Sequence, residues 1–370
     1  MKILLPLFFI LTTIIQQATA AVGWRNVTYN DAARAGRAVQ TYVYYPAATA
    51  TINAAFSAPV GTSYPLIVVG HGFAMDYDTY KWIADSLVPS GYIVAIVNTE
   101  TGFSPSHGTY GLDLRFISSI LKNESTTNTT SPFYQRLTNK SGITGHSMGG
   151  GCTFLAAGGS TEFACATSLA AAETTPSAIA AAATITVPTL VISGTEDCVA
   201  PPAGNQNEMY NALTVCRAKA YIIDGNHCDF SQYDFNCTFG ESTCNSTPTL
   251  SDVIQQRRTM QLLRPWFDFW LKNDCTAWPT FETRLALPAY NNTTFASMKA
   301  CTPIPQPIIT GFATSCIDEI QTYSVAPIAG STYLWSVIGG TILSGQYTET
   351  VVVQWLGSGV NSISCNQTAP

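Results

Sequence analysis

The sequence of 370 residues contains few charged residues and few histidines, and its basic residues form no cluster. Charged residues make up 11% of the chain, the formal net charge is -6, and there are four histidines. Nucleic-acid binding needs a face on which lysine and arginine gather, and no such run occurs. The absence of a CxxC pair and the scarcity of histidine argue against a structural metal site. We therefore expect no nucleic-acid partner, no metal and no cofactor.

The apolar run at the N-terminus, residues 3–15, is too short to span a bilayer. It follows Lys2 and precedes a small-x-small cleavage site at residues 18–20, which is the pattern of a signal peptide. We interpret residues 1–20 as a signal peptide and predict a secreted protein that leaves the membrane after cleavage. Eleven cysteines agree with export to an oxidising compartment, and their odd number leaves at least one without a partner in the chain.

Residues 145–149, with the sequence GHSMG, match the G-x-S-x-G nucleophile elbow. A short apolar run that begins at Ile143 precedes them, and small residues follow. This pattern predicts a strand, a sharp turn and a helix, with Ser147 on the turn. A serine hydroxyl becomes a useful nucleophile only when a base takes its proton. Because so short a motif also arises by chance, its interpretation depends on whether the rest of the chain supplies that base.

Strand and helix patterns alternate along the first two thirds of the chain. Continuous apolar runs indicate strands buried on both faces, and apolar residues at helical spacing indicate helices between them. The strands are predicted at residues 65–69, 92–97, 164–169, 189–193 and 218–223, and two helices at 77–88 and 111–121. The alternation predicts an α/β fold, a mainly parallel sheet flanked by helices, with functional groups at the carboxyl ends of the strands.

An acidic residue and a histidine follow two of the strands beyond the elbow. Asp197 lies in the loop after residues 189–193, and His227 in the loop after 218–223. The order Ser, Asp, His is the chain order of the α/β-hydrolase triad, in which the histidine takes the serine proton and the acid orients the histidine. Two alternatives for the acid remain open: Glu196, which adjoins Asp197, and Asp224, which lies close to His227 in sequence.

The other three histidines are weaker candidates for the base. His146 lies within the elbow and is expected to point away from the serine, His71 lies in a GHGF loop, and His107 lies in a Ser/Pro-rich loop. The GHGF loop follows the first buried strand, where a second oxyanion donor is expected. We therefore predict an oxyanion hole made by the backbone N–H groups of Phe73 and Met148.

With these residues in place, the chain resembles the polyester-hydrolase and cutinase-like group of α/β-hydrolases. That group includes poly(ethylene terephthalate) (PET) hydrolases and is related to the dienelactone hydrolases. The matching segments are LIVVGHGF (66–73), YKW (80–82), GHSMGGG (145–151), VPTL (187–190), ED (196–197), AP (200–201) and GNH (225–227), within residues 22–301. The resemblance implies an α/β-hydrolase fold and a serine esterase acting on an ester or polyester. It implies Ser147, Asp197 and His227 as triad, with Phe73 and Met148 as oxyanion donors.

The sequence departs from that group around its predicted acyl pocket. Polyester hydrolases carry a tryptophan on the loop after the strand that follows the elbow helix, and no tryptophan lies between Leu169 and Val187 here. We expect a substrate pocket walled by Phe73, Met148 and Glu173. Without the tryptophan, an aromatic contact of about 0.5–1.5 kcal/mol is missing. The sequence therefore predicts a preference for short-chain or aliphatic esters over aromatic polyesters.

A proline-rich linker at residues 302–307 separates a C-terminal segment with a different pattern. Short β-type runs at 321–325, 331–337 and 350–355 have the spacing of a small all-β, immunoglobulin-like sandwich. The segment resembles the PKD-like modules of secreted enzymes. We predict a catalytic domain over residues 21–301 and a PKD-like module over 308–370, whose role as spacer or as surface- or glycan-docking module stays open.

Cys198 and Cys228 each follow a predicted triad residue directly. Because the loops of the acid and the base must approach each other, we predict a disulfide between these two cysteines. The other predicted pairs are Cys275–Cys301 and Cys316–Cys365. Residues 228–247 are expected to form a disulfide-tied loop beside the site, and residues 251–272 a helix pair broken or kinked at Pro265.

Two other kinds of function remain open from the sequence. A non-catalytic binding or adhesion protein can use a hydrolase scaffold, although such a protein need not keep serine, acid and histidine in order. A lactonase, a dienelactone-hydrolase-like enzyme or a peptidase would use the same triad. Turnover of p-nitrophenyl butyrate separates an esterase from a binding protein, and a panel of substrates separates the enzymes.

Overall fold

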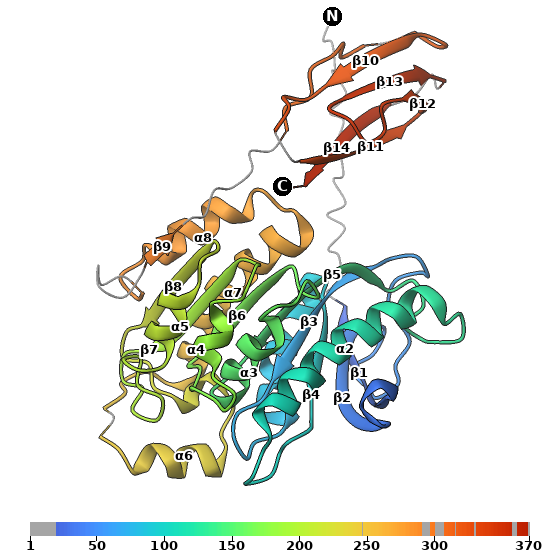
Figure 1. Ribbon diagram of the computed structural model, residues 1–370. Helices are drawn as coiled ribbons and strands as arrows, with labels where there is room; N and C mark the ends of the chain where they lie inside the picture. The colour runs from blue at the N-terminus through green and yellow to red at the C-terminus, as the bar shows by residue number, and fades with distance from the viewer. Residues whose placement is uncertain are drawn as a thin grey trace, which may run out of the picture.

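The computed structural model describes residues 20–245, 247–290, 297–299, 307–314, 316–328, 331–356 and 361–368 (Figure 1). The predicted signal peptide lies outside these ranges up to residue 19, as do residues 302–306 of the predicted linker. Cys301, one member of a predicted disulfide, also lies outside them. Among the described residues, no helix is both long and apolar enough to cross a membrane.

The larger part of the chain is built on a nine-stranded sheet of order β1-β2-β4-β3-β5-β6-β7-β8-β9. The pairs from β4 through β8 are parallel, while β1, β2 and β9 pair antiparallel at the two edges. The strands are β1 (Ala21–Asp31), β2 (Arg37–Ala47), β3 (Tyr64–Gly70), β4 (Ile93–Val97), β5 (Leu137–Gly145), β6 (Cys165–Leu169), β7 (Thr189–Gly194), β8 (Arg217–Ile222) and β9 (Ser297–Lys299). The predicted mainly parallel α/β fold is confirmed.

Apolar side chains of the central strands alternate between two hydrophobic cores, one on each face of the sheet. On β3, Leu66 and Val68 belong to one core, and Ile67 and Val69 to the other. The first core contains residues of α2 (His107–Thr127), α3 (Met148–Ala157), α4 (Ala178–Ala182) and α5 (Gln206–Ala212). The second contains residues of α1 (Lys81–Leu87), α7 (Asp252–Lys272) and α8 (Ala277–Leu285). Burial on both faces explains the continuous apolar runs of these strands.

Helix α7 is continuous, so the predicted break at Pro265 is wrong. A proline inside a helix has no N–H to donate, which leaves the carbonyl four residues earlier without its helical partner. That carbonyl belongs to Gln261, and Arg284 of α8 donates to it from Nη1 at 2.9 Å. The neighbouring helix therefore replaces the lost hydrogen bond, and Pro265 remains buried within a helix of 21 residues.

The C-terminal segment forms two antiparallel sheets with a core of their own. One sheet has the order β10-β13-β12 and the other pairs β11 with β14. Tyr323, Trp335 and Val351 from the two sheets belong to one buried cluster. The strands are β10 (Ile320–Ser324), β11 (Thr332–Ile338), β12 (Gly340–Ser344), β13 (Thr350–Trp355) and β14 (Ser362–Thr368). The predicted all-β sandwich is confirmed.

Candidate active site

Ser147 lies on a tight turn between β5 and α3, as the GHSMG motif predicts. Its backbone has φ 55° and ψ -119°, a conformation that costs energy for a residue with a side chain. A Cβ at Gly145 would collide with the Gly149 carbonyl, and a Cβ at Gly149 would collide with the carbonyls of Gly70 and His71. Glycine at both positions therefore lets the turn pack against β3 and its following loop.

His227 and Asp197 meet Ser147 at the carboxyl ends of β7 and β8. The Nε2 atom of His227 is 2.9 Å from Ser147 Oγ, and its Nδ1 atom is 2.9 Å from Asp197 Oδ2. The other Asp197 oxygen accepts from the N–H groups of Val199 and Ala200, at 3.1 and 2.8 Å. These bonds fix the carboxylate, which in turn directs Nδ1–H toward itself and leaves Nε2 to accept the serine proton.

The other candidates for acid and base have different partners. Glu196 accepts from the Thr247 hydroxyl at 3.2 Å, and the Asp224 N–H donates to Thr195 Oγ1. His107 Nδ1 accepts from the Thr175 N–H at 3.1 Å. His71 is buried within the GHGF loop, with Nδ1 2.8 Å from the Gly72 carbonyl and Nε2 2.7 Å from the Thr99 carbonyl. The geometry thus favours Ser147 as the nucleophile, His227 as the base and Asp197 as the acid.

The backbone N–H groups of Phe73 and Met148 lie in the loop after β3 and at the first residue of α3. A first-turn N–H has no acceptor within its own helix, so the Met148 N–H is available to a ligand. Within the described residues, the Phe73 N–H also has no hydrogen-bond acceptor, whereas the N–H groups of His71 and Gly72 donate to the hydroxyls of Tyr110 and Tyr80 at 2.8 and 2.9 Å.

A buried chain of hydrogen bonds connects this loop to His227, and no sequence pattern indicated it. Tyr80 Oη accepts from the Gly72 N–H and lies 2.7 Å from His146 Nδ1. His146 Nε2 lies 3.0 Å from the His227 carbonyl, which can only accept, so Nε2 carries the proton. Complete burial lowers the pKa of His146 well below its usual value, and repulsion from His227 lowers it further, so this ring is neutral.

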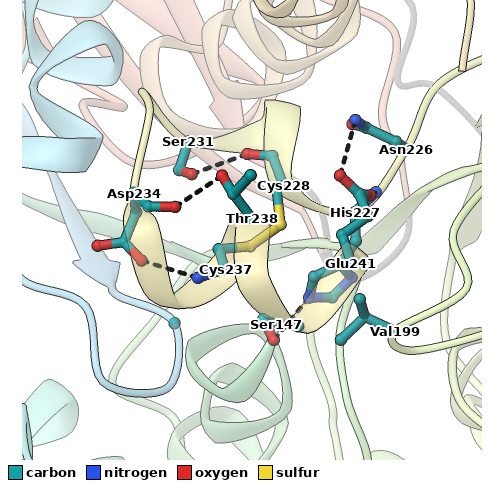
Figure 2. The surroundings of a disulfide bond; sticks show 12 residues. Ser147, Val199, Asn226, His227, Cys228, Ser231, Asp234, Cys237, Thr238 and Glu241 are labelled. Atoms are coloured by element: carbon teal, nitrogen blue, oxygen red, sulfur yellow. Dashed lines mark hydrogen bonds between the residues drawn. A yellow bond between two sulfur atoms is a disulfide. The ribbon is translucent and has the colours of Figure 1, made fainter. Parts of the chain in front are cut away.

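The segment after His227 contains helix α6 (Phe235–Ser242), which two disulfides tie to the loops of the acid and the base. The bridges are Cys198–Cys244 and Cys228–Cys237. The predicted Cys198–Cys228 bridge is therefore wrong: the two loops do approach, but the partner of Cys228 is Cys237 on α6, and the partner of Cys198 is Cys244, two residues after α6 ends. Figure 2 shows Cys228 joined to Cys237 on α6, next to His227 and Ser147.

The remaining disulfide predictions also differ from the structure. Cys316 and Cys365 are free thiols, the first exposed and the second half-buried. Cys275 is a free thiol as well, and its predicted partner lies outside the described residues. Cys216 is disulfide-bonded, although it belongs to none of the predicted pairs.

Glu241 on α6 holds the backbone next to the catalytic candidate His227. Its Oε1 accepts from the His227 N–H at 2.9 Å, and its Oε2 accepts from the Asn226 side-chain amide at 3.1 Å (Figure 2). Burial raises the pKa of this carboxyl, while the bonds from the His227 and Cys228 N–H groups oppose that rise. Glu241 was not predicted as a site residue. Its bond to the His227 N–H joins residues 14 positions apart, and the helix that carries Glu241 was not predicted.

Ser147 and His227 open into a cavity of about 280 Å³ with a mainly apolar lining. Its other lining residues are Phe73, Met75, Phe103, Val199, Asn236, Cys237, Phe239 and Gly240. Met148 and Glu173, both predicted as pocket residues, are not in this lining. Met148 is buried, and Glu173 Oε2 accepts from the Ile179 N–H at 3.1 Å, where the first turn of α4 favours a carboxylate. The aromatic side chains in the cavity lining are those of Phe73, Phe103 and Phe239.

No group of three or more histidine, cysteine, aspartate or glutamate side chains suited to a metal ion occurs in the described part of the chain. The arrangement can support acyl transfer with protein groups: a nucleophile, a base oriented by a carboxylate, and two backbone donors beside them.

Comparison with known proteins identifies the two parts of the chain. A family profile described as PET hydrolase-like matches residues 16–244, and a PKD-like domain profile matches residues 302–368. Bis(hydroxyethyl) terephthalate hydrolase of Streptomyces coelicolor is 26% identical over 200 residues, which are 54% of this chain and 58% of that protein. Cutinase est1 of Thermobifida alba is 25% identical over 178 residues, 48% of this chain and 57% of that protein.

The matched regions thus span less than two thirds of the length of these relatives. The family profile covers more than half of the chain and includes Ser147, Asp197 and His227. The chain belongs to the PET hydrolase-like family of α/β-hydrolases and carries a PKD-like domain after its hydrolase domain.

Proposed function

We propose that this protein is a secreted serine hydrolase that cleaves carboxylic esters, polyesters among them, through an acyl-enzyme on Ser147. The observation that carries the proposal is the pair of 2.9 Å contacts that His227 makes with Ser147 Oγ and Asp197 Oδ2 at the elbow. Family membership and two relatives named for terephthalate ester and cutin hydrolysis support ester substrates. Disulfides beside the site fit an oxidising compartment.

In the acylation step, Ser147 Oγ attacks the ester carbonyl carbon while its proton passes to His227 Nε2. Asp197 stabilises the imidazolium that forms. The carbonyl oxygen becomes an oxyanion, which the N–H groups of Phe73 and Met148 are placed to hold. Collapse of the tetrahedral intermediate breaks the ester C–O bond, and the leaving alcohol takes the proton from His227.

In the deacylation step, His227 removes a proton from a water molecule that attacks the acyl carbon. The second tetrahedral intermediate collapses, Ser147 Oγ recovers its proton from His227, and the carboxylic acid leaves. The hydrogen bonds through Tyr80 and His146 link the oxyanion loop to the His227 backbone. The same buried side chains therefore hold both the proposed oxyanion donor Phe73 and the proposed base His227 in position.

The experiment replaces Ser147 with alanine and measures turnover of p-nitrophenyl butyrate, a small lactone and a peptide anilide. We expect ester hydrolysis by the Ser147→Ala variant to fall by at least about 10⁴-fold. In the unaltered protein, we expect an organophosphonate to label Ser147 alone. Ser168→Ala is a matched control, because Ser168 is a buried serine on β6 whose hydroxyl has no hydrogen-bond partner within the described residues. Labelling of another serine, or faster cleavage of the anilide than of the ester, would overturn the proposal.

A further inference from the structure

Helix α6 has eight residues and none of them is buried. A helix of this length is marginal in water, and the usual source of helix stability, a buried apolar face, is missing. Covalent and polar tethers hold it instead. Cys228–Cys237 attaches the helix to the loop of His227, and Cys198–Cys244 attaches the turn just after it to the loop of Asp197. The Asn236 side chain donates to the Ala74 carbonyl at 2.9 Å, and Glu241 accepts from the His227 N–H at 2.9 Å. The protein thus fixes at the active site a helix that contributes little to its core.

The apolar side chains of α6 point to solvent beside the catalytic cavity. Phe235 and Phe239 are 69% and 63% exposed, and their rings stack at 6.3 Å. Phe239 also lines the cavity that contains Ser147 and His227. Phe103, which lines the same cavity, is 75% exposed and lies 6.0 Å from the Phe73 ring. An apolar surface of this kind on a water-soluble domain indicates a binding site.

We propose that α6 is a rigid aromatic platform that binds the aryl or alkyl segment of a water-insoluble polyester on either side of the ester being cleaved. This inference rests on the proposed esterase function. A cavity of about 280 Å³ is at the small end of ligand sites, so it holds little beyond the groups next to the scissile bond. Because Phe239 belongs to both the cavity and the exposed face, the rest of the same substrate chain meets Phe239 and Phe235.

Charge around the platform favours an uncharged polymer over an anionic lipid surface. Three carboxylates, Asp76, Asp78 and Asp234, line the hollow that adjoins Phe235 and Tyr233. A bilayer with anionic headgroups attracts basic segments and is repelled by carboxylates. An aliphatic or aromatic polyester surface carries no such charge in its bulk, so it meets the exposed rings without that penalty.

The test measures adsorption separately from catalysis. In a Ser147→Ala background, binding isotherms are recorded on amorphous PET and aliphatic polyester particles for the full chain and for Phe235→Ser/Phe239→Ser. The matched control is Ile52→Ser/Val60→Ser. Both control side chains are also exposed (51% and 66%), and they lie between β2 and β3, near the amino end of β3 and away from the catalytic cavity. Melting temperatures of all variants establish that each is folded.

We expect the Phe235→Ser/Phe239→Ser variant to bind polyester particles about tenfold more weakly than the control variant. With Ser147 restored, the ratio of its film hydrolysis to its p-nitrophenyl butyrate hydrolysis should fall by a similar factor. Equal adsorption of the two double variants would overturn the platform even if the chain is an esterase. Equally strong, phenylalanine-dependent binding to phosphatidylcholine vesicles, or loss of a dimer in the phenylalanine variant, would assign the face to a lipid or to a second copy and overturn it too. Absence of esterase activity with adsorption as expected would refute the proposed function alone.

Discussion

The Cys198–Cys244 bridge closes a loop of 46 residues that contains His227 and all of α6. Replacing both cysteines with serine removes this constraint from the unfolded chain. In the chain-entropy description, a loop of this length is worth about 4 kcal/mol, compared with about 2.5 kcal/mol for the nine-residue separation of Cys228 and Cys237. For a large domain, each kcal/mol lowers the melting temperature by about 2–4 °C. We therefore expect a fall of about 8–16 °C for Cys198→Ser/Cys244→Ser.

The same variant should also lower activity under conditions where the protein is folded. Cys198 follows Asp197 directly, and Glu241, which accepts from the His227 N–H, lies three residues before Cys244. Releasing the end of α6 therefore loosens both the acid and the base. Since a displacement of about 1 Å at a reacting group can cost about 100-fold in rate, we expect hydrolysis of p-nitrophenyl butyrate at 25 °C to fall by about tenfold or more.

Thermal unfolding followed by circular dichroism and initial rates on the soluble ester measure the two effects. Cys275→Ser is the matched control, because Cys275 is a half-buried free thiol away from the triad. The reasoning fails if Cys198→Ser/Cys244→Ser melts within about 4 °C of the control. It also fails for catalysis if the melting temperature falls while the rate at 25 °C stays within twofold of the control, since α6 would then not position the triad.

Three further outcomes follow from other parts of the structure. Burial, then the charges of Glu241 and Asp252, raises the pKa of Asp229 from 3.8 to about 6. Because the pKa of Asp229 is higher in the folded than in the unfolded protein, its neutral carboxyl group favours folding below pH 4. This contribution to stability is lost as the pH rises through 6 and the buried group becomes charged. Asp229→Asn should therefore stabilise the protein by roughly 1–2 kcal/mol at pH 8, after allowance for partial exposure, and leave it unchanged at pH 3, as urea unfolding at both pH values can check. Gly149→Ala should destabilise by about 1–3 kcal/mol and lower the ester rate at least about tenfold, because its Cβ meets backbone of the oxyanion loop, whereas Gly102→Ala, with open space around it, should be neutral in the same assays. A chain ending at residue 301 should keep its rate on p-nitrophenyl butyrate, because the C-terminal strands have a separate core, and a large loss of rate in a truncated chain that still unfolds cooperatively would contradict this.

The elements that the sequence predicted well are those that bury an apolar face. β3 and β4 are buried on both sides, so their runs of Val, Ile and Leu indicate strands clearly, and the glycine at position 145 reflects a backbone contact with Gly149, four residues later. The candidate triad could be proposed because parallel strands place their following loops at one edge of the sheet. The contact between Tyr80 and His146 joins residues 66 positions apart and depends on how the loop after β3 packs, which no periodicity records.

Helix α6 escaped prediction for the complementary reason. Pattern analysis detects a helix by the stripe of residues that it hides from water, and α6 hides none. Its cysteines were visible, but the premise that the acid and base loops approach each other leads to a direct Cys198–Cys228 bridge unless a third element lies between them. One bridge on the helix and a second just after its end are expected if the helix must stay in place without help from the core. The disulfides keep Phe239 in the lining of the cavity and Phe235 stacked against it, so the binding proposed for these two rings explains why α6 is held covalently.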